Sequence, residues 1–315
     1  MEQVFLGEYI RQRRADIGLT QAQLCEGICE PMTLSRLERG KQAPAYRTIN
    51  ALLERLGLPG SRYFALLSKN EVDVEALKNG IRADVILFER AAEEDLPRIR
   101  ERALAKIEQL KQLSDADDRI TQQYILSEKA SLGKPEGPYS FEERLDMLME
   151  AIKLTAPRFS LEEIEQGWYS MDETMLISKI ARTYSIAGQR KKAIDVYRQL
   201  LRYIEKHNQE LSGFAGHFCL VAHNYAICLT LEKRYKEAIE FAERGWRICI
   251  EYGNYQFLPG FLAVLAECFY FAGETQKSMK FYLQAYCIYD AIGDSANLEI
   301  IRQEMQERLG RMPPF

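Results

Sequence analysis

Residues 28–44 read ICEPMTLSRLERGKQAP, and this stretch decides how the first part of the chain folds. It places Arg36, Arg39 and Lys41 within six residues, around the single carboxylate of Glu38. Such a cationic cluster is unexpected in a chain whose net charge is −4. A local concentration of arginine and lysine on an acidic protein indicates that this segment meets an anion.

The residues around this stretch predict two short helices joined by a tight turn. TQAQL at residues 20–24 has Thr20 as an N-cap and Gln23 three positions later, which is the pattern of a capping box. Gly27 breaks this first helix after about Glu26. Pro31 suits the first position of the second helix, where a missing N–H costs nothing, and that helix runs to Gly40.

Two amphipathic helices flank this pair. Apolar residues recur at helical spacing over residues 4–17 and again from Ile49 to Leu56. Two short helices with a tight turn, buried by flanking helices, form the helix-turn-helix arrangement. Its second helix lies in the DNA major groove, with N-terminal side chains facing the bases. Helical spacing buries Leu34 and Leu37, and the expected DNA-facing residues are Met32, Thr33, Ser35, Arg36, Arg39 and, in the following loop, Lys41.

The stretch GEYIRQRRADIGLTQAQL (7–24), followed by TLSRLERGKQAP (33–44), resembles the Xre/lambda-repressor type of helix-turn-helix. The resemblance implies that Gln21 contacts a DNA phosphate and that Glu38 pairs with Arg14 on the first helix. The chain departs from the family pattern at Arg13, a position that is usually apolar. A small helical bundle with an exposed basic loop is the alternative that helical spacing alone does not exclude.

A second departure concerns the recognition helix. Pro31 and Met32 stand where many members of that family carry polar side chains that contact bases. Thr33, Ser35 and Arg36 are therefore the expected base-contacting residues.

The rest of the chain predicts a helical repeat. Residues 1–70 carry a net charge of +3 and residues 71–315 a net charge of −7. From Val72 onward nearly every window has helical periodicity, and three segments align: 176–201, 220–245 and 261–286. Small residues recur in matching places, with a large residue between them: Ala181, Ala226 and Ala266, then Tyr184, Leu229 and Phe269, then Ala193, Ala238 and Ser278.

This pattern resembles the tetratricopeptide repeat in a degenerate form, since the matching small residues are 45 and 40 residues apart and the repeats lack the closing proline. Weaker pairs are expected at 72–113 and 117–155, with a terminal helix at 297–309. A stack of helix pairs forms a superhelix with a concave groove. We therefore predict an all-α chain, with a helix-turn-helix domain at residues 1–68 and a tetratricopeptide-like domain at residues 69–315.

A helix-turn-helix head on such a body resembles the Rgg/PlcR branch of peptide-sensing (RRNPP-type) regulators. The resemblance implies a cytoplasmic homodimer that binds double-stranded DNA and a short signalling peptide. Repeat register places seven candidate peptide contacts on the first helix of each pair: Lys179, Arg182, His223, Asn224, Ile227, Glu267 and Tyr270. An asparagine such as Asn224 can bond both the N–H and the C=O of a peptide backbone. Lys179 and Arg182 can hold a carboxylate, but each also fits an ordinary surface charge.

The sequence contains no motif that indicates a metal site, a redox centre, an enzyme or a membrane span. The three histidines have no metal-ligand spacing, and Cys25 and Cys29 have no second cysteine pair, so neither a metal nor another cofactor is expected. No nearby charge in the sequence favours a redox-active cysteine. No phosphate-binding loop, dinucleotide fingerprint or nucleophile elbow indicates an enzyme. The longest apolar run (257–273) is too short for a membrane span and contains Pro259 and Glu267.

Three functions remain open. A peptide-gated transcription regulator accounts for both parts of the chain. A phage-type or antitoxin-type repressor accounts for the head only, and a repeat scaffold that binds another protein accounts for the body only.

Overall fold

The computed structural model of the chain describes residues 6–58, 69–91, 93–115, 117–133, 139–207 and 213–310. Every regular element within these residues is a helix, which confirms the all-α prediction. The chain divides into two compact units: residues 1–187 with 203–212, and residues 188–202 with 213–315. The predicted domain boundary between residues 68 and 69 lies outside the described residues.

The first four helices form the predicted helix-turn-helix domain. They are α1 (Leu6–Asp16), α2 (Gln21–Cys25), α3 (Pro31–Glu38) and α4 (Tyr46–Arg55). Thr20 and Gln23 make both bonds of the capping box at the start of α2, and Pro31 occupies the first turn of α3. The core of this domain is a fully buried apolar set: Ile10, Leu24, Leu34, Leu52 and Leu53.

A glycine sets the distance between α1 and α3. A Cβ atom built on Gly7 would lie 1.9 Å from the carbonyl oxygen of Leu37. Only a residue without a side chain permits this approach. Gly7 therefore brings the recognition helix against the first helix of the domain.

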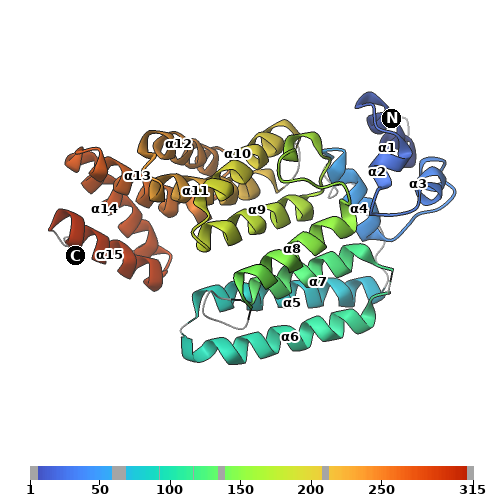
Figure 1. Cartoon of the computed structure of the whole chain (residues 1–315), viewed down its shortest axis with the longest axis horizontal. Coiled ribbons are helices and arrows are strands. Elements are labelled where there is room, and N and C mark those ends of the chain that lie inside the picture. Colours follow the sequence, from blue (N-terminus) through green and yellow to red (C-terminus); the bar gives the residue numbers. More distant parts are fainter. Residues whose placement is uncertain are drawn as a thin grey trace. The chain divides into compact units, whose positions relative to one another are not determined.

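The remainder of the first unit consists of helix pairs (Figure 1). Helix α5 packs on α6 and α7 packs on α8, in the two places where the sequence predicts weaker repeats. These helices and those that follow are α5 (Lys69–Arg90), η2 (Glu93–Asp95), α6 (Leu96–Leu113), α7 (Arg119–Ser131), α8 (Phe141–Thr155), η3 (Ile164–Gln166) and α9 (Met171–Ile186). Helix α9 packs on α8, α7 and α4, so it joins the repeats to the helix-turn-helix domain within this unit.

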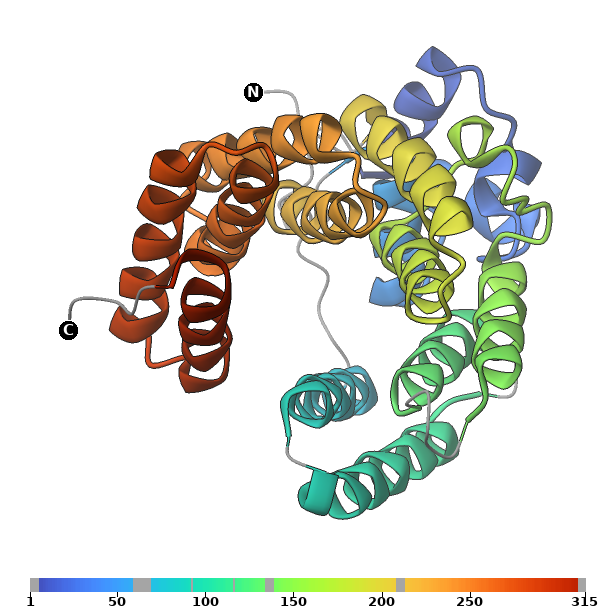
Figure 2. The same cartoon turned by 60° about the vertical axis from the view of Figure 1, so that its left-hand side comes forward.

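The second unit is a stack of helices in which each element packs on the next, from α11 to α15 (Figure 2). Its members are α10 (Arg190–His207), which the first unit shares from Tyr203 onward, α11 (Phe214–Leu231), α12 (Tyr235–Glu251), η4 (Tyr255–Phe257), α13 (Leu258–Phe271), α14 (Thr275–Ala291) and α15 (Ser295–Leu309). The small residues of the aligned segments are all fully buried: Ala181, Ala193, Ala226, Ala238, Ala266 and Ser278. This confirms the tetratricopeptide-like packing.

Candidate functional site

Helix α3 has the two faces that the sequence predicts. Leu34 and Leu37 are buried in the domain core, whereas Arg36, Arg39 and Lys41 are exposed. Met32 is the most open apolar side chain here, at 63% exposure. Thr33 and Ser35 are half-buried at the border of this surface.

The arginines of this surface make only local bonds. Arg39 donates to the carbonyl oxygen of Ser35 from Nε and to its Oγ from Nη2, each at 3.0 Å. Arg36 lies 3.5 Å from the Oε1 atom of Gln42. Exposed bonds of this kind contribute little, so both guanidinium groups can exchange them for phosphate or base contacts.

Behind α3, the buried carboxylate of Glu38 accepts three side-chain hydrogen bonds. Arg14 donates from Nε at 2.7 Å and from Nη2 at 3.0 Å, which confirms the pairing that the family resemblance implies. Gln21 donates from Nε2 at 2.6 Å. The side chain of Gln21 is therefore bonded within the domain here, and its contact with a DNA phosphate stays a prediction.

Arg13, which departs from the family pattern, also has a defined place. Its Nε atom donates to the carbonyl oxygen of Leu56 at 3.2 Å, just beyond the end of α4. A helix end leaves carbonyl groups without partners inside the helix. Arg13 satisfies one of them, so a charged residue is accommodated where an apolar one is usual.

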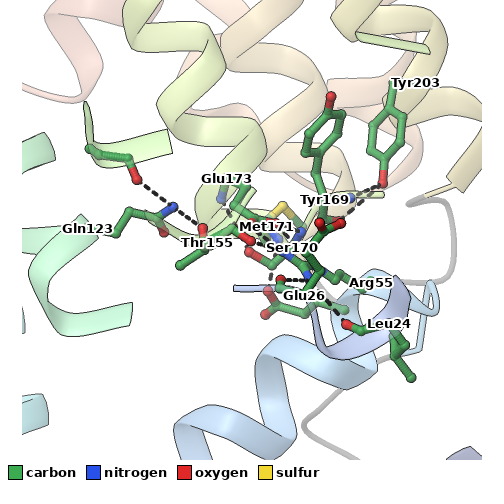
Figure 3. Close-up of polar contacts among 12 residues, drawn as sticks. Leu24, Glu26, Arg55, Gln123, Thr155, Tyr169, Ser170, Met171, Glu173 and Tyr203 are labelled. Carbon is green, nitrogen blue, oxygen red and sulfur yellow. Dashed lines mark hydrogen bonds and ion pairs between the residues drawn. The ribbon is translucent and has the colours of Figure 1, made fainter. Parts of the chain in front are cut away.

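A buried arginine joins the helix-turn-helix domain to the repeats (Figure 3). Arg55, at the end of α4, is 3% exposed and donates to the carbonyl oxygens of Leu24 and Glu26 at 3.0 and 2.7 Å. Its Nη2 atom also donates to the carbonyl oxygen of Thr155 at 2.8 Å and to Oε1 of Glu173 at 2.7 Å. One guanidinium group thus contacts α2, the turn after it, the end of α8 and the start of α9.

The partners of Arg55 are themselves held in place. The side chain of Glu173 accepts from the backbone N–H of Ser170 at 2.6 Å, and the side chain of Ser170 accepts from the backbone N–H of Glu173. These two bonds form the capping box at the start of α9. Gln123 on α7 donates from Nε2 both to the hydroxyl oxygen of Thr155 and to the carbonyl oxygen of Ala151. This second layer fixes the orientation of the groups that Arg55 contacts.

Glu54, the neighbour of Arg55, makes a parallel link. Its Oε2 atom accepts from the backbone N–H of Met171 at 2.8 Å, and its Oε1 atom accepts from Asn50 at 2.8 Å. Burial, together with the nearby Asp172 carboxylate, raises the pKa of Glu54 to about 8. Sequence reasoning missed both Glu54 and Arg55, because a polar pair at the end of an amphipathic helix is typical of a solvated face.

A backbone contact completes this junction. Gly27, in the turn between α2 and α3, has a φ of +73°, and a Cβ there would lie 2.0 Å from the carbonyl oxygen of Thr155. A side chain at residue 27 would be both strained and in collision with α8. The turn that holds the recognition helix therefore rests directly on the repeats of the same unit.

Besides a cavity of about 280 Å³ that Arg55 and Thr155 line, two adjoining cavities open on the α5, α7 and α9 side of this junction. One of about 250 Å³ is lined from α4 by Asn50 and Glu54 and from the repeats by Lys78 and Gln123. The other, of about 370 Å³, is lined by residues of α5, α7 and α9, and Lys179 is among them. The two share five lining residues, so they adjoin: Arg82, Gln123, Tyr124, Met171 and Asp172.

Two of the predicted peptide contacts lie in this first unit, on α9. Lys179 is half-buried and bonded to Oε1 of Glu128 at 2.8 Å and to Oγ of Ser127 at 3.0 Å. Arg182 forms an ion pair with Glu89 on α5. Both cations thus have protein partners, and only Lys179 lines the larger cavity.

The other predicted contacts lie in the second unit, on α11 and α13. His223, Asn224 and Ile227 are half-buried on α11. The ring of His223 packs edge-on against Phe261, with centroids 5.4 Å apart, and burial lowers its pKa to about 4. These features give His223 a packing role in addition to any ligand contact.

Glu267 and Tyr270 lie one turn apart on α13. Glu267 forms an ion pair with Arg308 of α15, in which Oε1 lies 2.7 Å from Nη2. Tyr270 packs its ring against Phe271, with ring centroids 5.3 Å apart. Both side chains are half-buried. A peptide contact by any of these residues stays a prediction.

The described residues contain no group of three or more histidine, cysteine, aspartate or glutamate side chains that could hold a metal ion. All seven cysteines are free thiols. By length and composition α11 could cross a membrane, and 61% of it is buried inside the structure.

Comparison with known proteins agrees with this architecture. Residues 6–63 match the family model of a helix-turn-helix domain. No curated protein sequence matches the chain. The matched residues contain α1 to α4, so the domain identified by sequence pattern and the domain in the structure coincide.

Solved structures similar in fold cover nearly the whole chain. PlcR from Bacillus thuringiensis, solved with the peptide PapR7 and DNA, has a TM-score of 0.59 and 21% identity, over 94% of this chain and 98% of its own. The apo form of PlcR has a TM-score of 0.57 and 19% identity, over 95% and 98%.

The apo form of the competence regulator ComR from Streptococcus vestibularis has a TM-score of 0.54 and 16% identity, over 96% of this chain and 97% of its own. These structures share with this chain a helix-turn-helix domain followed by helical repeats. The predicted resemblance to the Rgg/PlcR branch is therefore confirmed at the level of the fold: the chain carries a helix-turn-helix domain and has the fold of PlcR and ComR.

Proposed function

We propose that this protein is a cytoplasmic transcription regulator that binds duplex DNA as a homodimer and changes this binding when a short peptide occupies its repeats. The observation that carries the proposal is the Arg55 network. It bonds the helix-turn-helix turn to α8 and α9 through one buried guanidinium group. A ligand that shifts α9 would therefore change the support of the recognition helix. If the protein has two conformations that differ in this support, a ligand that binds one of them more tightly raises the population of that conformation.

The DNA contact of the proposal rests on α3. Its exposed face offers Arg36 and Arg39, and Lys41 follows in the loop. Arginine can bond guanine through two atoms in the major groove, whereas lysine and arginine near the backbone neutralise phosphates. PlcR, which shares this fold, has been solved with DNA, and this supports the same partner here.

The ligand of the proposal is a short peptide. PlcR was solved with the peptide PapR7. In this chain the two adjoining cavities of the first unit offer about 250 and 370 Å³ beside Lys179 and Arg82. Because α4 lines the smaller cavity, a peptide in the larger one lies next to the helix-turn-helix domain. In the second unit, Asn224 on α11 is proposed by itself as a peptide contact, because an asparagine can bond both the N–H and the C=O of a peptide backbone.

Calorimetry with synthetic peptides encoded beside the gene tests the peptide. Lys179→Met and Asn224→Ala are each expected to weaken binding by roughly tenfold, because each leaves a peptide polar group without its partner. Lys277→Met is the matched control, since Lys277 is an exposed lysine on α14 whose ion pair with Glu274 is local to that helix. If no short peptide binds the wild-type protein, the peptide-sensing part of the proposal fails, and a repressor or a protein-binding scaffold without a peptide ligand remains.

The homodimer is proposed because one recognition helix covers only half of a DNA site. A two-fold pair of such helices reaches successive major grooves on one face of the duplex. Light scattering at micromolar concentration tests this. A monomeric mass with and without DNA would exclude the dimer.

A further inference from the structure

A second buried arginine lies in the first unit, and sequence reasoning did not single it out. Arg144, near the start of α8, is 7% exposed. Its aliphatic stem packs on Gly133, where an added Cβ would lie 2.8 Å from Cδ of Arg144. Its Nε atom donates to the carbonyl oxygen of Ala130 at 3.3 Å. The end of α7 and the residues just after it therefore hold this side chain in place.

Arg144 differs from Arg55 in its partners. Every guanidinium nitrogen of Arg55 donates a hydrogen bond, and Glu173 balances its charge. Within the part of the chain that the structure describes, Arg144 forms no ion pair, and the bond to Ala130 is its only hydrogen bond. A buried charge without an opposite charge is costly. The protein therefore keeps at Arg144 a cation that its described residues do not neutralise.

Two more cations line the same small cavity, which has a volume of about 20 Å³. Lys179 pairs with Glu128 at 2.8 Å, and Arg182 forms an ion pair with Glu89. Burial, together with the positive charge of Arg182, lowers the pKa of Arg144. Three cations thus meet at this cavity, with two carboxylates among their described partners. One further carboxylate would balance the group.

The size and chemistry of the cavity restrict the anion that it can take. A space of about 20 Å³ holds little more than one water molecule, so it admits a terminal group and not a whole residue. The hydroxyl groups of Ser131 and Thr183 also line it, but each donates to the backbone carbonyl oxygen four residues earlier, at 3.1 and 2.9 Å. The donors for an anion are therefore the cations. A guanidinium group matches the two oxygens of a carboxylate.

We propose that Arg144 is the centre of a carboxylate-binding site, completed by Lys179 and Arg182, which holds the C-terminal carboxylate of the signalling peptide. The identity of this ligand rests on the proposed function. Lys179 lines both this cavity and the cavity of about 370 Å³, so a peptide in the larger cavity can extend past Lys179 to Arg144. Every unmodified peptide ends in a carboxylate, so the site recognises an end and not a particular side chain.

Urea denaturation of the full-length protein, in sodium acetate and in sodium chloride at equal ionic strength, tests the site without a peptide. A ligand that binds only the folded state raises its stability. The wild type should have a higher urea midpoint in acetate than in chloride, whereas Arg144→Met should have the same midpoint in both. Arg98→Met is the matched control, because Arg98 is 80% exposed, and it should respond like the wild type. Equal midpoints of the wild type in the two salts would overturn the site.

The stability of Arg144→Met in chloride gives a second readout. Methionine keeps the apolar stem, and the carbonyl oxygen of Ala130 keeps its bond from the backbone N–H of Gly133 at 3.4 Å. The variant should therefore unfold at the same urea midpoint as the wild type or at a higher one. A fall as large as that of Arg55→Met would show that Arg144 serves the fold, and would overturn its assignment to a ligand.

Calorimetry with a peptide that binds, prepared as the free acid and as the C-terminal amide, tests the source of the carboxylate. The wild type should bind the acid at least about tenfold more tightly, as expected for hydrogen bonds to a charged group. Arg144→Met should bind the two forms alike. Arg144→Lys should keep part of the preference, because lysine supplies the charge without the paired donors. Equal binding of acid and amide by the wild type would overturn the assignment to the C-terminus.

The failure of this inference can be distinguished from the failure of the proposed function. If no peptide binds in either form, while acetate stabilises the wild type and not Arg144→Met, the proposed peptide sensing fails and the site takes a free small carboxylate. If a peptide binds equally as acid and as amide, and acetate has no effect, the proposed function stands and the carboxylate site is wrong.

Discussion

Arg55 and Glu173 form an ion pair that is almost fully excluded from solvent, although 118 residues separate them in the chain. Their side chains are 2% and 1% exposed, and the Nη2 and Oε1 atoms lie 2.7 Å apart. The pair joins the end of α4 to the first turn of α9. It is the most deeply buried ion pair between the helix-turn-helix domain and a repeat helix that the described residues show.

Removing one partner of this pair should destabilise the first unit strongly. Arg55→Met leaves the Glu173 carboxylate buried without its cation, and Arg55 also bonds three carbonyl oxygens. We expect the free energy of unfolding to fall by about 3–5 kcal/mol, as for other broken buried pairs. Urea denaturation followed by circular dichroism measures the change.

Arg98→Ala is the matched control for this experiment. Arg98 pairs with Asp95 at 3.2 Å, but its side chain is 80% exposed. An exposed pair contributes less than about 1 kcal/mol. Equal losses in Arg55→Met and Arg98→Ala would contradict the structural role of Arg55.

Glu38→Ala should destabilise the helix-turn-helix domain. The carboxylate is buried and accepts from both Arg14 and Gln21, so its removal leaves three N–H groups of these two residues without this acceptor. A loss of about 1–3 kcal/mol is expected for stranding such groups, and the melting temperature should fall accordingly. Gln21→Ala removes only one neutral donor and should cost less. A melting curve of Glu38→Ala that overlays the wild type would contradict the pairing.

The two basic residues near the end of α3 should affect DNA binding in different ways. Arg36 is an expected base contact, so Arg36→Ala should reduce affinity for the operator by about 1–3 kcal/mol relative to a scrambled site. Lys41 lies in the loop, so Lys41→Ala should weaken binding to both sites and flatten the dependence on salt. Fluorescence anisotropy over a salt series measures both. Equal losses on the two sites for Arg36→Ala would remove it as a base contact.

Acid should destabilise the second unit through its buried histidines. Burial lowers the pKa of His223 from 6.5 to about 4, and the pKa of His217 to about 4. The folded state therefore binds protons less readily than the unfolded state, and stability is lost as the pH falls from 6.5 towards 4. His223→Phe places another aromatic ring beside Phe261 and should reduce this loss, leaving the part due to His217. The test compares the denaturation midpoints of the wild type and of His223→Phe at pH 7 and at pH 5. An equal fall in midpoint for the two proteins would contradict the role of His223.

Much of this architecture could be predicted from local patterns. The capping box at Thr20, the proline that begins α3 and the periodic small residues such as Ala226 and Ala238 depend on neighbours within a turn or two of helix. Such signals are visible in a single sequence. The pairing of Glu38 with Arg14 came from family resemblance instead, since the two residues lie on different helices.

The junction could not be predicted in this way. Arg55 ends an amphipathic helix, where a basic residue ordinarily interacts with the helix dipole in solvent. Glu173 stands three positions after Ser170, where it completes a capping box. Each residue satisfies a local rule, so neither sequence position indicates that it is buried. Only the contact between α4 and α9, remote in sequence, removes both side chains from water.

The same contact limits how this protein can be divided. A fragment that ends before α8 would retain Arg55 while losing both Glu173 and the carbonyl oxygen of Thr155. Its α4 would then end on a water-exposed cation, and the turn before α3 would lose its support from α8. A chimera that grafts this head onto another regulator should therefore carry an acceptor for Arg55 at the start of the corresponding helix. Without one, the graft keeps the recognition surface and loses the connection through which a signal could reach it.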